Sequence, residues 1–131
     1  MNPASIDIVA MLEAESSLGL TFKTDIFIGT EPKEPDNCVT IYDTPSYPPS
    51  LTMNKEERYY YSSCQIRVRN NSYAIGMALA RDILVLLHGR ANESWNGTLY
   101  TVIHETGEPA LLDNDGNNRS LIVFNINSQR R

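Results

Sequence analysis

Apolar positions change their period along the chain, and the changes predict where helices and strands lie. From Ile6 to Leu12 the apolar residues recur at helical spacings; Pro3 suits a first helical turn and Gly19 marks the expected end, so the first twenty residues indicate a helix. From residue 21 to residue 28 apolar and polar side chains alternate, which predicts a strand that Gly29 closes. The chain therefore begins with a helix followed by a strand.

Two further strands enclose a long loop rich in proline. Residues 38–42 form a short apolar run, and residues 59–69 alternate most clearly, with one side expected in the core and the other facing solvent or a partner. Between them, residues 43–57 carry three prolines and show no period. Loops of about 12–15 residues or more in compact domains tend to be functional or mobile.

The segment from Tyr73 to His88 predicts a second helix, with N-cap candidates in residues 70–72 and a stop at Gly89. Its main apolar stripe, expected to face a sheet, consists of Tyr73, Gly76, Met77, Ala80, Ile83, Leu84 and Leu87. A second stripe of Ile75, Leu79 and Leu86 lies off that face, and a chain this short has few other elements to cover it.

The last apolar runs predict strands at residues 99–103 and 120–126, separated by a loop with two turn signals, and the final residues indicate a solvated tail. The order is helix, two strands, long loop, strand, helix and two strands. We therefore expect one α+β domain over residues 1–131, with a mostly antiparallel sheet of four or five strands and helices packed on one face.

Composition narrows the class of protein. Hydrophobic residues make up 41% of the 131 residues, which suffices for a packed core, and the net charge of -5 disfavours a protein that grips phosphate backbone. No membrane-spanning or signal-peptide pattern is present, so we expect no membrane contact and a reducing host cytoplasm. Cys38 and Cys64 are then expected to pack as small apolar side chains within strands.

Residues that could carry catalysis are few. A small metal-dependent enzyme would use His88, His104, Glu105, Asp113 or Asp115, but the chain has no metal-ligand spacing and no nucleophile motif. The Asp113–Asn117 run fails the calcium-loop pattern and is typical of a turn. We therefore expect no cofactor, no metal and no enzymatic activity.

The remaining features indicate an interaction protein. Tyrosines and arginines on the outward strand face resemble a stacking surface for single-stranded nucleic acid, but alternating tyrosine is equally typical of a protein interface. The negative net charge of the chain favours the protein interface. The candidate interface residues come from the proline-rich loop, this strand face and the second helical stripe. They are Tyr47, Leu51, Met53, Tyr59, Tyr61, Arg67, Arg69, Ile75, Leu79 and Leu86.

Several stretches also carry a family resemblance. Residues 24–29 (TDIFIG), the turn of residues 32–37 and residues 39–44 (VTIYDT) resemble the front half of phage minor capsid or tail terminator proteins. Residues 65–69 (QIRVR) and the helix that opens at Tyr73 and ends in residues 86–89 (LLHG) resemble their middle. The order of elements agrees over nearly the whole chain.

The resemblance implies a structural virion protein at the head-tail junction, assembled with the rest of the particle in the host cytoplasm. Such subunits form a ring, usually hexameric, that ends tail-tube polymerisation and docks the neck. The implied partners are further copies of the chain, the tail-tube protein and a head-tail connector or stopper protein, with genomic DNA passing through the lumen without sequence-specific binding. A head-completion or stopper protein is the alternative within the virion.

Overall fold

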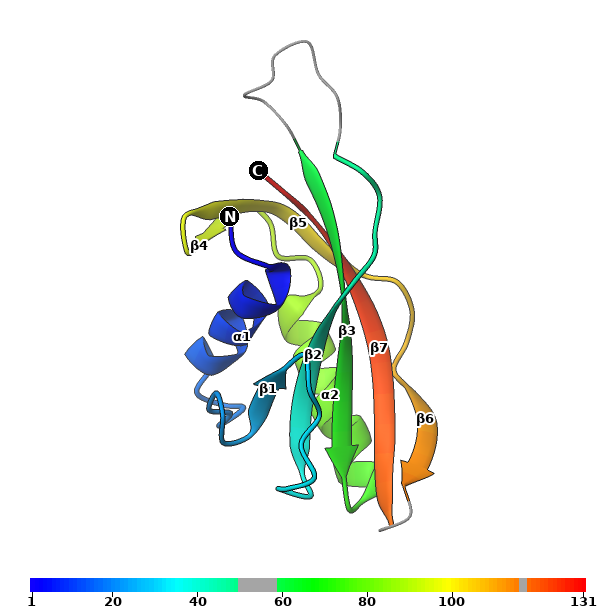
Figure 1. Ribbon diagram of the computed structural model, residues 1–131. Helices are drawn as coiled ribbons and strands as arrows, with labels where there is room; N and C mark the ends of the chain where they lie inside the picture. The colour runs from blue at the N-terminus through cyan, green and yellow to red at the C-terminus, as the bar shows by residue number, and fades with distance from the viewer. Residues whose placement is uncertain (50–58, 116–117) are drawn as a thin grey trace.

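The computed structural model describes residues 1–49, 59–115 and 118–131 (Figure 1). The elements, in chain order, are α1 (Ala4–Ala14), β1 (Ile26–Ile28), β2 (Cys38–Thr44), β3 (Tyr60–Asn70), α2 (Tyr73–Leu87), β4 (Glu93–Trp95), β5 (Thr98–Glu105), β6 (Ala110–Asp115) and β7 (Arg119–Arg130). The fold is α+β, as the alternation of periods predicts.

The sheet is larger than expected and mixed. Among the described residues it has seven strands in the order β1-β2-β3-β7-β5-β4, with β6 pairing separately with β7. All pairs are antiparallel except β1 with β2, where Ile26 lies beside Val39 in a parallel register. The expectation of four or five strands missed β4 and β6, because neither short strand has an apolar alternation of its own.

Strand β7 organises the sheet. One of its edges pairs with β3 from Tyr60 to Asn70, and its other edge is shared by β5 at one end and β6 at the other. The strand runs to Arg130, beyond the predicted end at residue 126, so the expectation that Arg130 belongs to a solvated tail is wrong. The polar residues of this last part are held by partners: Ser128, for example, forms a hydrogen bond with Ser62 across the ladder.

Both helices cover the same face of the sheet, as predicted (Figure 1). Helix α1 packs on β1, β2 and β3, while α2 packs on β3, β5 and β7. The core between the layers consists of the inward alternation of the strands and one face of each helix; its largest fully buried members are Tyr100, Ile8, Met11, Leu12, Ile26, Ile41, Ile66, Ile83, Leu87, Ile103, Ile122 and Ile126.

The helix ends are set locally. Helix α1 ends at Ala14, five residues before the expected stop at Gly19, and turns occupy the residues between. Helix α2 begins after Ser72, whose hydroxyl accepts a hydrogen bond from the Ile75 amide at 3.4 Å. It ends before Gly89, which has a φ of 88° and so takes the left-handed conformation that glycine favours.

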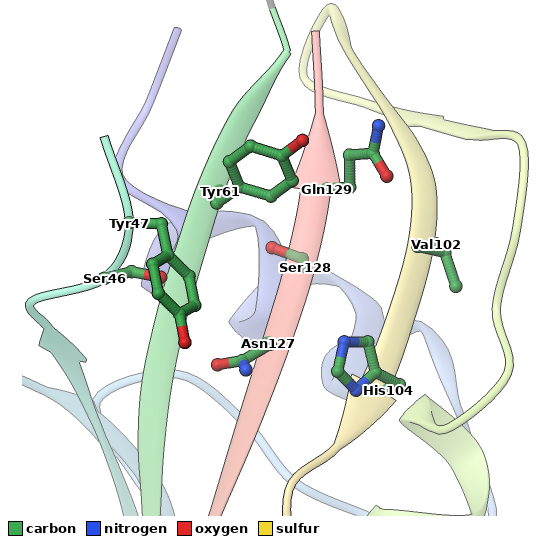
Figure 2. Close-up of a pocket in the computed structure, with 8 residues that line it drawn as sticks. All are labelled: Ser46, Tyr47, Tyr61, Val102, His104, Asn127, Ser128 and Gln129. Atoms are coloured by element: carbon green, nitrogen blue, oxygen red, sulfur yellow. The ribbon is translucent and has the colours of Figure 1, made fainter. Parts of the chain in front are cut away.

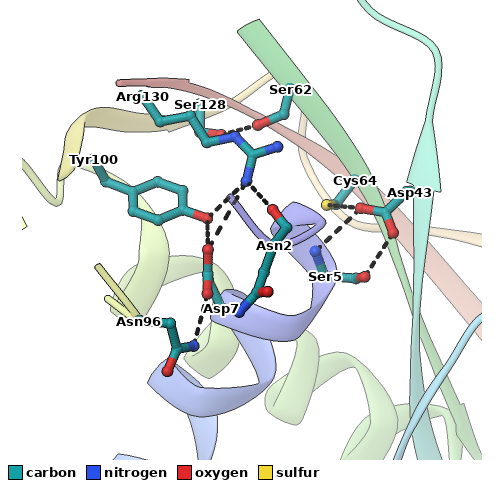
Figure 3. A network of polar contacts seen from close by, with 10 residues as sticks. All are labelled: Asn2, Ser5, Asp7, Asp43, Ser62, Cys64, Asn96, Tyr100, Ser128 and Arg130. Carbon is teal, nitrogen blue, oxygen red and sulfur yellow. Dashed lines mark hydrogen bonds and ion pairs between the residues drawn. The ribbon is translucent and has the colours of Figure 1, made fainter. Parts of the chain in front are cut away.

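A buried polar network anchors α1 to the end of the chain (Figure 3). The fully buried Asp7 carboxylate accepts hydrogen bonds from the Tyr100 hydroxyl and, at 2.7 Å, from the Asn96 amide, and it lies 3.9 Å from the Arg130 guanidinium. Arg130 also donates to the Asn2 carbonyl at 2.7 Å. Burial, together with the Asp7 carboxylate, raises the pKa of Tyr100, so this hydroxyl stays a donor.

A second contact fixes the start of α1 against β2. Both the backbone amide and the hydroxyl of Ser5 donate to the Asp43 carboxylate, at 3.1 and 2.6 Å. The Cys64 thiol lies 3.6 Å from the same carboxylate, and burial raises the pKa of this thiol. Cys38 and Cys64 are buried free thiols, which confirms their predicted packing in strands.

No helix in the described part of the chain is long and apolar enough to cross a membrane.

Candidate interaction surfaces

Both helices of the described residues lie on one face of the sheet, and the opposite face, the outer face, is left without a helix from this part of the chain (Figure 1). On this outer face the odd-numbered residues of β3 lie opposite the odd-numbered residues of β7: Tyr61 pairs with Gln129, Ser63 with Asn127, Gln65 with Asn125 and Arg67 with Val123. For residues 61–67 the alternation of β3 thus correctly predicted which side chains leave the core. The face is dominated by amides, hydroxyls and aromatic rings.

A pocket of about 260 Å³ opens on this outer face (Figure 2). Two tyrosines from different segments border it on one side and β5 on the other; the full lining is Ser46, Tyr47, Tyr61, Val102, His104, Asn127, Ser128 and Gln129. Tyr47 and Tyr61 were expected at an interface, and the structure brings them together here. The β7 residues of the lining are absent from the candidates because the predicted strand ends at residue 126, and His104 is a candidate only for catalysis.

Arg67 and Tyr59 flank the outer face but are already engaged within the chain. The Arg67 guanidinium lies 5.0 Å from the centre of the Tyr42 ring and donates to the Gln65 side chain at 2.8 Å. The Arg131 guanidinium lies 5.6 Å from the Tyr59 ring centre. Both residues are half-buried, so each offers a partner part of its surface.

Arg69 does not have the exposed position that the sequence predicted. The residue is only 5% exposed, and its guanidinium donates to the carbonyls of Pro35 and Asp36 at 2.7 and 3.1 Å. It also lies 3.8 Å from Glu31, while Arg119 donates to the carbonyl of Lys33 at 2.6 Å. These two arginines hold the 31–37 connector against the sheet. Because Arg69 is used in this way, the hypothesis of a basic stacking face for nucleic acid loses one of its cations.

The second stripe of α2 is not the continuous open surface that was expected. Ile75 is 63% exposed, but Leu79 and Leu86 are half-buried against the core. Leu18, in the turns after α1, lines two surface depressions, one with each of these leucines. Tyr73 was expected on the core-facing stripe and is instead exposed, because it stands at the first turn of the helix.

Two candidates, Leu51 and Met53 of the proline-rich loop, lie outside the described residues. The part of this loop that is described ends at Pro49, and Tyr47 is its most exposed large side chain there.

The candidate catalytic residues do not converge. The Nδ1 atom of His88 accepts a hydrogen bond from the Glu105 backbone amide at 3.0 Å. The Nδ1 atom of His104 lies 3.1 Å from the Glu105 carbonyl oxygen. Asp113 pairs with Leu121 of β7 and Glu105 with Ile126, five positions apart, which corresponds to about 17 Å along the strand. Within the described ranges no three His, Cys, Asp or Glu side chains are grouped as metal ligands would be.

Sequence reasoning did not find two apolar surfaces at the borders of the sheet. One is a groove of about 450 Å³ beside α1 and β1, lined by Ile6, Val9, Ala10, Glu13, Phe22, Ile28 and Asn96. The other is an exposed pair on β6, Leu111 and Leu112. The only signal for the second was two adjacent leucines inside an otherwise polar loop.

Comparison with known proteins gives one family and a clear fold. The sequence profile of a family described as "Bacteriophage tail terminator protein" matches residues 15–130. A chain from the virion of a native gene transfer agent particle has the same fold, with a TM-score of 0.67 and 13% identity over 96% of this chain and 92% of its own. A second solved chain aligns with a TM-score of 0.59 at 12% identity over 98% and 91%. No curated protein matches.

Proposed function

Because the chain belongs to the bacteriophage tail terminator family, we propose that it is a structural virion protein that ends tail-tube polymerisation at the head-proximal end of the tail. In this role, copies of the chain form a ring, usually hexameric in such proteins, that sits on the last tube layer. The upper surface of the ring docks the connector or stopper of the neck, and genomic DNA passes through the lumen. The subunit acts by contact, without catalysis or a cofactor.

The observation that carries the proposal is the family match over residues 15–130, which includes every strand of the sheet. The surfaces of the described residues agree with a contact role: the fold presents a sheet face without helices and apolar side chains at two borders. The net charge of -5 also suits a conduit, since a strongly basic lumen would retain the passing DNA.

The test is electron microscopy of tails made by a phage whose copy of this gene is deleted. We expect tails of uncontrolled length that do not join heads, and complementation with the wild-type gene restores uniform, head-attached tails. Tails of normal length that remain unattached would overturn the terminator role in favour of a stopper or head-completion protein. Normal tails attached to heads would overturn any role at the junction.

A further inference from the structure

Two exposed apolar surfaces lie at opposite borders of the same sheet, and they differ in shape. We call the pair Leu111 and Leu112 the β6 ridge, and the depression beside α1 and β1 that Ile6 and Phe22 help to line the α1 groove. From β1 to β6 the sheet runs through β2, β3 and β7, which is four interstrand steps or about 19 Å. Figure 1 shows α1 and β6 on opposite sides of the molecule.

The β6 ridge projects side chains rather than an open backbone edge. Leu111 and Leu112 are 44% and 55% exposed, which is unusual for two adjacent leucines on a border strand. The ladder to β7 shifts its register between Leu111 and Asp113, so Leu112 occupies a bulge. A bulge interrupts the regular row of backbone donors and acceptors. The ridge is therefore suited to insertion into a depression and poorly suited to the addition of another strand.

The α1 groove has the size and lining to receive such side chains. Its volume is about 450 Å³, and most of its lining residues are apolar. Ile6, at 40%, is the most exposed of its apolar residues, and Phe22 forms part of the rim. Apolar walls that stay open to water gain stability when an apolar partner covers them.

The charges near the two surfaces oppose each other. Lys23, with its ammonium 5.8 Å from the Phe22 ring centre, stands at the groove, and the exposed Asp113 follows Leu112 on the ridge. The groove also contains Glu13, while Arg81 stands near β6, held 3.0 Å from Glu108. Lys23 at the groove and Asp113 on the ridge have opposite charges, so each can neutralise the other when the two surfaces meet.

We propose that the β6 ridge of one copy inserts into the α1 groove of the next copy, so that the chain associates head to tail. A ring requires this kind of contact, in which two different patches of one subunit meet, and convex and concave surfaces at opposite borders provide them. The proposal names the subunit contacts of the ring and rests on the proposed function for the existence of that ring.

Two charge insertions and a matched control test the contact in the purified protein. Ile6→Glu places a charge in the groove and Leu112→Glu places one on the ridge. Each variant is expected to weaken self-association by at least about 30-fold, equivalent to about 2 kcal/mol, as for an interface hot spot. Val85→Glu, at a largely exposed apolar position of α2 outside both surfaces, leaves self-association unchanged. Circular dichroism establishes that each variant is folded.

Mixing the two disabled variants separates a head-to-tail contact from a symmetric one. In a 1:1 mixture the intact ridge of Ile6→Glu meets the intact groove of Leu112→Glu, and analytical ultracentrifugation should detect dimers and nothing larger. A symmetric contact would give no such rescue. Failure to form dimers in the mixture, or full-size assemblies from either variant alone, overturns the proposed surfaces.

Cysteine cross-linking repeats the test in assembled tails, where the ring is held by its other partners. Ala10→Cys combined with Leu112→Cys should give a ladder of linked copies on oxidation, while either single variant gives none. The native Cys38 and Cys64 are buried and do not contribute. No ladder from tails of normal length overturns the contact but leaves the terminator role intact. Failure of the terminator role appears separately, as normal, head-attached tails in the deletion phage.

Discussion

The Asp7 network predicts how strongly α1 is fastened to the rest of the fold. Replacing Asp7 with Asn keeps the shape of the side chain and one acceptor oxygen but removes the charge. The Tyr100 hydroxyl and the Asn96 amide both donate to this carboxylate, and Arg130 lies 3.9 Å away. In the variant, the NH₂ group of the introduced asparagine therefore faces a donor from Tyr100 or Asn96. The guanidinium of Arg130, whose side chain is 11% exposed, loses its counter-charge.

The expected cost follows from these contacts. A hydrogen bond to a charged group contributes about 1.5–3 kcal/mol, and the amide oxygen retains part of one of the two. Removing a buried carboxylate also saves some desolvation, which offsets part of the loss. We therefore expect Asp7→Asn to lower the free energy of unfolding by about 3 kcal/mol. Tyr100→Phe, which removes one donor, should cost about 1.5 kcal/mol, with a coupling of about 1–2 kcal/mol in the double variant.

Urea unfolding followed by circular dichroism measures these differences, provided that the slope with denaturant is the same for all variants. Asp82→Asn, on the exposed side of α2, is the matched control and should stay within about 0.5 kcal/mol of the wild type. An effect of Asp7→Asn no larger than the control would refute the network as an anchor. Strict additivity of the two substitutions would show that the Tyr100 hydrogen bond does not depend on the charge of Asp7.

Three further predictions concern the connector, the helix and the alkaline limb. Arg69→Ala should cost about 2–3 kcal/mol, because the carbonyls of Pro35 and Asp36 lose a charged donor, and faster proteolysis within the connector checks its release. Gly76→Ala should lower the melting temperature, because the new Cβ would lie 3.0 Å from Asn70 Cβ and from Ile122 Cδ1. This crowding costs about 1–3 kcal/mol, more than the gain in helix propensity of about 1 kcal/mol, and a higher melting temperature would contradict it. Burial raises the folded-state pKa values of Cys64 and Tyr100 above their ordinary values of 9.0 and 10.0, so the unfolded state loses these protons first as the pH rises. The free energy of unfolding therefore falls from about pH 9 upward, by up to about 1.4 kcal/mol per pH unit for each group. In a pH series of urea titrations, Tyr100→Phe should make this fall less steep above pH 10.

The periodic segments of the fold were predictable, and the polar strands were not. Helix α2 and strand β3 carry strong apolar periods, so their positions and core faces followed from the sequence. The end of β7 has none, because Ser128 and Arg130 are polar side chains that contact Ser62 and Asp7. Strand β6 exists because the edge of β7 beyond β5 needs a partner. Such pairing depends on tertiary neighbours, which a local period does not contain.

The local sequence pattern also could not predict which candidate residues remain exposed to solvent. Arg67 and Arg69 occupy equivalent positions of one alternation, yet only Arg69 is buried, because the 31–37 connector folds back over it. Leu79 and Ile75 were placed on one helical stripe, and only Leu79 is covered by the turns after α1. In both cases a non-periodic segment decides exposure, and its path is fixed by contacts far away in the sequence.

The distribution of exposed side chains separates two kinds of surface on this small subunit. Apolar side chains are exposed at the sheet borders, at Leu112 and Ile6, and on the outside of α2, at Ile75 and Val85, whereas the outer face of the sheet is polar and carries the pocket beside Tyr47. Covering the apolar borders when copies associate removes apolar surface from water, and the convex β6 ridge and the concave α1 groove have shapes that can cover each other. A polar, aromatic face suits a contact that forms later, with a different virion protein. Substitutions at the borders should therefore change self-association, while Tyr47→Ser should leave it unchanged.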